Sequence, residues 1–88
     1  MIDTVNRDFG GRFVLVVDDD VRLRSYIGTL LGSANAQVLE AGDGLEALQL
    51  FRVWRDKLAL VITDIRMPRM SGKDLALLIR LQSEIPLI

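Results

Sequence analysis

The 88-residue sequence contains no cysteine and no histidine. Without cysteine the chain forms no disulfide and offers no thiolate to a metal, which agrees with a reducing compartment. Without histidine it has no imidazole to serve as a general base, as a metal ligand or as a carrier of a phosphoryl group. Any metal site in this chain therefore has to be built from oxygen atoms.

The sequence also lacks an excess of charge of one sign and a long hydrophobic run. Its 11 basic and 12 acidic residues give a net charge of −1, so we expect no direct binding of nucleic acid. No apolar stretch near the N-terminus is as long as a signal peptide or a membrane span, and we expect a cytoplasmic protein without membrane contact. The length suits one small domain, for which we expect a flexible leader at residues 1–12 and a folded part at residues 13–88.

Hydrophobic residues make up 50% of the chain and occur in short runs. These runs predict strands at residues 13–17, 38–41 and 58–63, and the start of a fourth strand at residues 85–88. Strands that alternate with helices and short connections are typical of an α/β fold with a parallel sheet and helices on both faces.

Three helices are predicted between these strands. Apolar residues recur with helical spacing after the first strand, at Leu23, Tyr26, Ile27, Leu30 and Leu31. We expect Gly32 and Ser33 to end that helix. The sequence Asp43-Gly44-Leu45-Glu46 has the spacing of a capping box at the start of the second helix. Ser71 is expected to cap the third.

Acidic residues follow the first and third strands directly: Asp18 and Asp19 after one, Asp64 after the other. In a flavodoxin-like doubly wound sheet with strand order 2-1-3-4, these strands are neighbours and their carboxyl ends flank the point where ligands bind. Carboxylates gathered there repel one another unless a cation is present, and an all-oxygen site suits Mg²⁺. Asp20 is instead interpreted as a helix cap.

Three sequence fragments carry a family resemblance. "VLVVDDD", "AGDGLEAL" and "LVITDIRMPRMSG" resemble, in order and spacing, the receiver domain of bacterial two-component response regulators. The resemblance implies that Asp64 accepts a phosphoryl group from a sensor histidine kinase or a phosphotransfer protein. It also implies that Asp18 and Asp19 hold Mg²⁺ together with Asp64, and that Arg66 adds its backbone carbonyl. A receiver domain is a phosphoacceptor and not an enzyme, with at most slow self-dephosphorylation.

The residues after Asp64 fit such a site. Met67 is interpreted as an apolar plug and Pro68 as a brace that stiffens the loop. We expect Gly72 to allow a backbone turn that other residues avoid. The side chains of Arg66 and Arg69 are interpreted as solvated loop charges.

The resemblance covers roughly the first two-thirds of a receiver domain. The family pattern places a Ser or Thr after the fourth strand and a Lys after the fifth, whereas this sequence stops at Ile88. We therefore expect slow phosphorylation with little signalling. We also expect exposed apolar surface on Val14–Val17 or Leu60–Ile62, an unpaired edge at residues 86–88, and self-association, for instance as a homodimer.

Two other functions remain open from the sequence. "VLVVDDD" also resembles the D-x-D motif of haloacid-dehalogenase-type phosphatases, in which Asp18 would be the nucleophile and Asp20 the general acid. Arg22 departs from that motif, where Thr or Val is expected. The third hypothesis is a receiver-like interaction module that is never phosphorylated.

Overall fold

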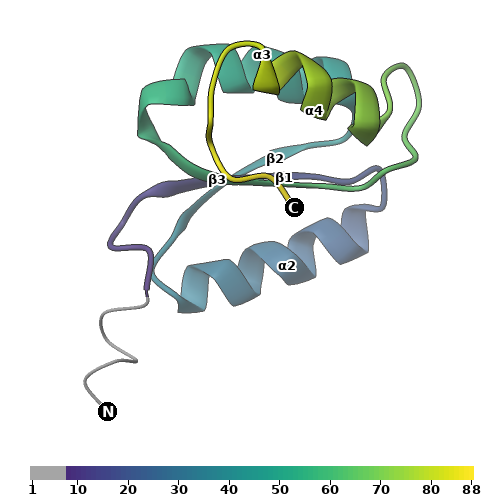
Figure 1. Ribbon diagram of the computed structural model, residues 1–88. Coiled ribbons are helices and arrows are strands. Elements are labelled where there is room, and N and C mark those ends of the chain that lie inside the picture. The colour runs from purple at the N-terminus through teal and green to yellow at the C-terminus, as the bar shows by residue number, and fades with distance from the viewer. Residues whose placement is uncertain (1–7) are drawn as a thin grey trace.

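The structure is a computed structural model that describes residues 8–88 (Figure 1). A three-stranded parallel sheet has the strand order β2-β1-β3. No helix among the described residues is both long enough and apolar enough to cross a membrane. The elements are, in chain order, β1 (Phe13–Val17), α2 (Val21–Ser33), β2 (Gln37–Ala41), α3 (Gly44–Trp54), the 3-10 turn η1 (Arg55–Lys57), β3 (Leu58–Thr63) and α4 (Gly72–Arg80).

The predicted α/β fold and the order of the first three strands are confirmed. The fourth predicted strand is reduced to one parallel bridge between Val61 and Leu87, beside β3. The Val61 N–H donates to the Pro86 carbonyl at 3.0 Å, and the Ile88 N–H donates to the Val61 carbonyl at 2.9 Å. The last residues therefore lie where a strand order of 2-1-3-4 places them, although they form no extended ladder.

The helices cover the two faces of the sheet unequally. Figure 1 shows α3 and α4 on one face and α2 alone on the other. The face under α3 and α4 holds the main core, because alternate residues of β1 and β3 point toward both helices. Its largest fully buried side chains are Leu15, Val17, Phe51, Val61, Leu75 and Ile79.

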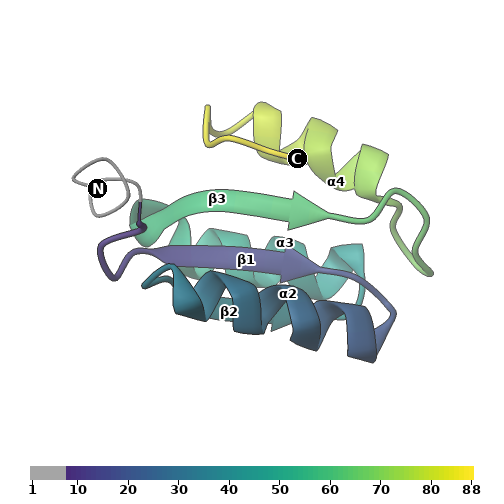
Figure 2. The same ribbon diagram turned by 90° about the horizontal axis from the view of Figure 1, so that it is seen from below.

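The predicted buried stripe of α2 is only partly correct. Ile27 and Leu31 are half-buried, whereas Leu23, Tyr26 and Leu30 are 45%, 63% and 53% exposed. The reason is the position of α2, which packs on β1 and β2 and leaves β3 uncovered when the sheet is seen from below (Figure 2). The outer half of the stripe thus has no described neighbour to pack against.

Exposed apolar surface was expected on Val14–Val17 or on Leu60–Ile62, and the first of these alternatives does not occur. Val14 to Val17 are all at most 1% exposed, because β1 is the central strand and has helices over both faces. Leu60 and Ile62 of β3 are half-buried, so the uncovered part of the sheet lies on β3.

The leader divides into two parts. Residues 1–7 lie outside the described part of the chain. Residues 8–12 form a turn that is bonded to the connection between α2 and β2: the Phe9 N–H donates to Ala34 and the Gly11 N–H to Asn35, at 2.8 and 2.7 Å. The domain boundary at residue 12 stays a prediction.

Candidate functional site

Three carboxylates meet at the carboxyl edge of the sheet. One oxygen each of Asp18, Asp19 and Asp64 lie within 4.8 Å of one another. Asp18 and Asp19 follow β1, and Asp64 follows β3, its direct neighbour. The convergence predicted from strand order is therefore present, although 45 positions of sequence separate Asp64 from Asp19.

Main-chain hydrogen bonds fix where these residues lie. The Asp64 N–H donates to the Val17 carbonyl at 2.9 Å, and the Asp18 N–H donates to the Ala41 carbonyl at 3.1 Å. Each acid thus continues the ladder of its strand by one bond. The spacing of the cluster follows from the distance between neighbouring strands, about 4.8 Å in any sheet.

The three carboxylates differ in exposure. Asp18 is buried, with 6% of its surface exposed, and its Oδ1 accepts the Asp20 N–H at 2.9 Å. Asp19 is exposed. Asp64 is half-buried, and its Oδ1 accepts the Ile65 N–H at 2.8 Å, which leaves Oδ2 for another partner. The cluster therefore has a closed side at Asp18 and an open side at Asp19 and Asp64.

Asp20 is not part of the cluster. Its Oδ1 accepts the N–H groups of Arg22 and Leu23 at 3.0 and 3.3 Å, so it is the N-cap of α2. The predicted capping role is confirmed. In the phosphatase hypothesis Asp20 is the general acid, but here its carboxylate is directed at the start of the helix.

The loop between β3 and α4 is held close to Asp64. Arg66 is exposed on this loop, and Met67 is half-buried against the core. The role of Met67 as a plug stays a prediction. Gly72 has no positive φ, so the predicted reason for this glycine is wrong. A Cβ on Gly72 would lie 1.8 Å from the Asp64 carbonyl oxygen. The Gly72 N–H donates a hydrogen bond to the Ile65 carbonyl at 2.8 Å. Glycine is needed here because two stretches of backbone touch.

Arg69 is exposed to solvent, with 61% of its side chain accessible, but it is also paired with an acidic residue, which the sequence interpretation did not include. Its Nε donates to Asp43 Oδ2 at 3.0 Å, and its Nη2 pairs with the same oxygen. Asp43 also caps α3 by accepting the Glu46 N–H at 2.9 Å. This backbone hydrogen bond and the Arg69 guanidinium lower the pKa of Asp43 below its ordinary value of 3.8. Arg69 has φ of +68°, a backbone conformation that is uncommon without glycine.

Sequence analysis did not single out Arg24 or Glu40. The Arg24 side chain is only 17% exposed and donates hydrogen bonds to Glu40 of β2 and to the Asp18 backbone carbonyl. The available indication was its position on α2, one turn before Gly28, on the side that faces the sheet. An arginine on that side of the helix, four residues after Asp20, is seldom buried without a partner, so a specific acceptor could have been expected.

Comparison with known proteins agrees with this arrangement. The family model described as "response regulator receiver domain" matches residues 14–88. A probable transcriptional regulator, ycf27 of Cyanophora paradoxa, is 36% identical over 75 residues, which is 85% of this chain and 30% of that protein. The chain thus spans less than a third of this relative.

Two solved structures have the same fold. A response regulator receiver domain protein from Clostridium thermocellum superposes with a TM-score of 0.81 at 30% identity, over 86% of this chain and 61% of that one. The CheX–CheY–BeF3–Mg complex from Borrelia burgdorferi also gives 0.81, at 26% identity, over 86% of this chain and 58% of that one.

Proposed function

The chain belongs to the response regulator receiver domain family, and on this basis we propose that Asp64 accepts a phosphoryl group from a histidine kinase or a phosphotransfer protein. Mg²⁺ is the proposed cofactor, held by the side chains of Asp18, Asp19 and Asp64 and by the backbone carbonyl of Arg66. The observation that carries the proposal is the meeting of three carboxylates within 4.8 Å at the ends of β1 and β3. As a receiver domain, the chain is a regulatory module and not an enzyme.

The donor atoms suit a small, hard cation. All are oxygens, and Mg²⁺ prefers carboxylate, carbonyl, water and phosphate oxygens. Asp19 is exposed and Asp64 is half-buried, so water and a phosphoryl donor can approach this side of the cluster from solvent. When bound, Mg²⁺ supplies the positive charge that offsets repulsion between the Asp64 carboxylate and the incoming phosphoryl oxygens. The Borrelia burgdorferi complex, which contains BeF3 and Mg, supports this choice of metal.

In the proposed reaction Asp64 is the nucleophile. Its Oδ2 bonds to the phosphorus of the donor phosphohistidine, and the P–N bond breaks with its electron pair returning to the imidazole ring. Oδ1 keeps the hydrogen bond from Ile65, which holds the carboxylate in one orientation. Loss of the phosphoryl group to water, which we expect to be slow, is the only turnover included in the proposal.

The proposed partners are the phosphoryl donor and a second copy of this chain. Self-association is supported by the exposed apolar side chains of α2 and by residues 86–88, which pair with β3 on one side only among the described residues. A cytoplasmic location and the absence of direct contact with nucleic acid remain predictions from the sequence.

Acetyl phosphate with Mg²⁺ tests the function directly. We expect mass spectrometry of the intact protein to show one phosphoryl adduct, and peptide mapping to place it on Asp64. Asp64→Asn should abolish the adduct, while Asp20→Asn, which keeps a good helix cap, should retain it. An adduct on Asp18 would instead favour the phosphatase hypothesis. A wild-type protein that gives no adduct with acetyl phosphate or with a phosphorylated kinase would favour the interaction module.

A further inference from the structure

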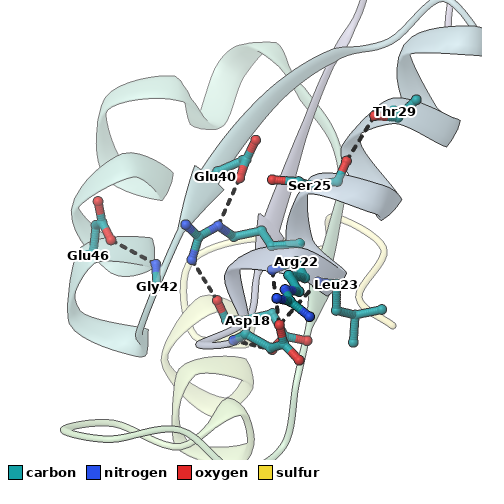
Figure 3. A network of polar contacts seen from close by, with 10 residues as sticks. Asp18, Arg22, Leu23, Ser25, Thr29, Glu40, Gly42 and Glu46 are labelled. Atoms are coloured by element: carbon teal, nitrogen blue, oxygen red, sulfur yellow. Dashed lines mark hydrogen bonds and ion pairs between the residues drawn. The ribbon is translucent and has the colours of Figure 1, made fainter.

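Arg24 joins three elements beside the acidic cluster. Its Nη1 donates to the Asp18 carbonyl at 2.8 Å, and its Nε donates to Glu40 Oε1 at 2.8 Å. The dashed lines that reach Asp18 and Glu40 in Figure 3 mark the two ends of this bridge. α2 is thereby tied both to β2 and to the peptide that follows β1.

The surroundings of Arg24 are shaped for a guanidinium group. A Cβ at Gly42 would lie 3.3 Å from Arg24 Nη1, so a larger residue would press on this group. The Gly42 N–H donates to Glu46 Oε1 at 2.8 Å, which fixes the turn that contains Gly42. The guanidinium thus lies in a place with polar partners on two sides and backbone on a third.

The hydrogen bond from Arg24 to the Asp18 carbonyl affects the orientation of both Asp18 and Asp19. That carbonyl and the Asp19 N–H belong to one planar peptide group, so a fixed oxygen fixes the whole plane. The Asp18 side chain is held separately by the Asp20 N–H. The orientation of the peptide between the first two carboxylates, and with it the direction of the Asp19 side chain, therefore depends on Arg24.

We infer that Arg24 is a positioning residue for divalent-cation binding, that it sets the Asp18–Asp19 peptide plane, and that Glu40 holds Arg24 in place. The inference rests on the proposed Mg²⁺ site. Arg24 contacts no proposed ligand atom, so its effect is on the geometry of the ligands.

The sign of the effect separates positioning from electrostatics. Arg24 is a positive charge next to an acidic site, so its removal should strengthen cation binding if charge alone mattered. Loss of positioning should weaken binding instead, about tenfold by analogy with residues that orient metal ligands. Arg24→Gln removes both the charge and the positioning hydrogen bonds. Whether cation affinity rises or falls in this variant shows which of the two effects is larger.

The experiment measures Mg²⁺ affinity by calorimetry and Mn²⁺ affinity by water-proton relaxation for the wild type, Arg24→Gln and Glu40→Gln. Arg22→Gln is the matched control, since it makes the same charge change on an exposed neighbour in the same helix. We expect weaker binding for Arg24→Gln, a smaller loss for Glu40→Gln, and unchanged or slightly stronger binding for Arg22→Gln. The Asp19 amide resonance of metal-free Arg24→Gln should also move, while the urea midpoint should stay close to that of the wild type.

Each result is decisive. If the wild type binds neither ion, the proposed function fails and not only this inference. If the wild type binds and Arg24→Gln binds equally well or more tightly, the inference is wrong. It is also wrong if the loss of affinity matches the loss of folded protein in the urea curve, or if Arg22→Gln weakens binding as much.

Discussion

The guanidinium of Arg69 and the carboxylate of Asp43 join the loop after β3 to the start of α3. Asp43 is the N-cap of α3, and Arg69 lies five residues after Asp64. The loop that follows the candidate phosphoacceptor is therefore anchored to a helix from another part of the chain. Beside this pair, Met70 lies so close to Gly44 that a Cβ at Gly44 would be 2.6 Å from it.

The backbone hydrogen bond from Glu46 and the ion pair with Arg69 both act on Asp43, and together they predict a dependence of stability on pH. The folded state lowers the pKa of Asp43 below 3.8, so its contribution is complete above that value and is lost as the pH falls through the lower, folded pKa. Asp43→Asn keeps a capping side chain but not the charge. We expect a lower urea midpoint for Asp43→Asn at pH 7, and a gap to the wild type that narrows below about pH 4.

Arg69→Gln is the complementary test of the pair. It should lower the urea midpoint at pH 7 and weaken the dependence of the midpoint on pH. Some pH dependence should remain, because the backbone hydrogen bonds to Asp43 are still made. Arg66→Gln, on the same loop and exposed, is the control and should have little effect. A gap between Asp43→Asn and the wild type that stayed constant from pH 7 to pH 2 would contradict the lowered pKa of Asp43.

The proposed metal site predicts the effect of Asp19→Asn. This change removes one charged ligand from a site that has few, so the affinity for Mg²⁺ should fall several-fold. Asp56→Asn makes the same charge change in η1, before β3 begins, and should leave the affinity almost unaltered. Titration calorimetry gives both values, and equal affinities for the wild type and Asp19→Asn would remove Asp19 from the site.

We expect Gly72 to tolerate no side chain. Gly72→Ala places a methyl group against the Asp64 carbonyl oxygen, and backbone cannot move aside as a flexible side chain can. We expect a loss of about 3 kcal/mol or more in the free energy of unfolding. Gly32→Ala is the matched control in α2, where a Cβ meets nothing within 4 Å, and it should gain about 0.5–1 kcal/mol. Urea denaturation of the two variants would show the contrast, and a similar small effect for both would refute the close backbone contact.

Self-association predicts that the oligomeric state depends on protein concentration and that the exposed apolar residues of α2 contribute to the interface. Leu30→Glu introduces a charge among the exposed apolar residues of α2, whereas Val53→Glu does so on α3, at a residue that is 75% exposed. In sedimentation equilibrium we expect the wild type and Val53→Glu to associate and Leu30→Glu to remain a monomer. A wild-type protein that is monomeric and well folded at all micromolar concentrations would contradict the proposal.

The sequence predicted the strands and the acidic cluster because both follow from local pattern and strand order. Asp64 could be placed beside Asp18 once β1 and β3 were taken as neighbours. The exposure of Tyr26 could not be predicted, since helical spacing tells which residues share a face and not how much of that face a sheet covers.

The partners of Arg24 and Arg69 were beyond sequence reasoning for another reason. Each arginine binds a residue at least 16 positions away in sequence, Glu40 or Asp43, and such pairs depend on the final packing of loops and helices. Gly72 was recognised as important but for the wrong reason. A close approach between two backbones is set by tertiary structure, whereas a turn is set by the local chain.

The ladder bonds that hold Asp18 and Asp64 have a consequence for hydrogen exchange. The Asp18 N–H is hydrogen-bonded to the Ala41 carbonyl, and the Asp64 N–H to the Val17 carbonyl. Both bonds adjoin the central strand β1, which is almost completely buried. Such amide protons are protected while these hydrogen bonds hold, so their protection reports the free energy of opening this edge of the sheet. An ion that binds the native state adds RT ln(1 + [L]/Kd) to that free energy. Hydrogen-exchange protection of these two amides should therefore rise with cation concentration, and the size of the rise measures how tightly the cation is bound.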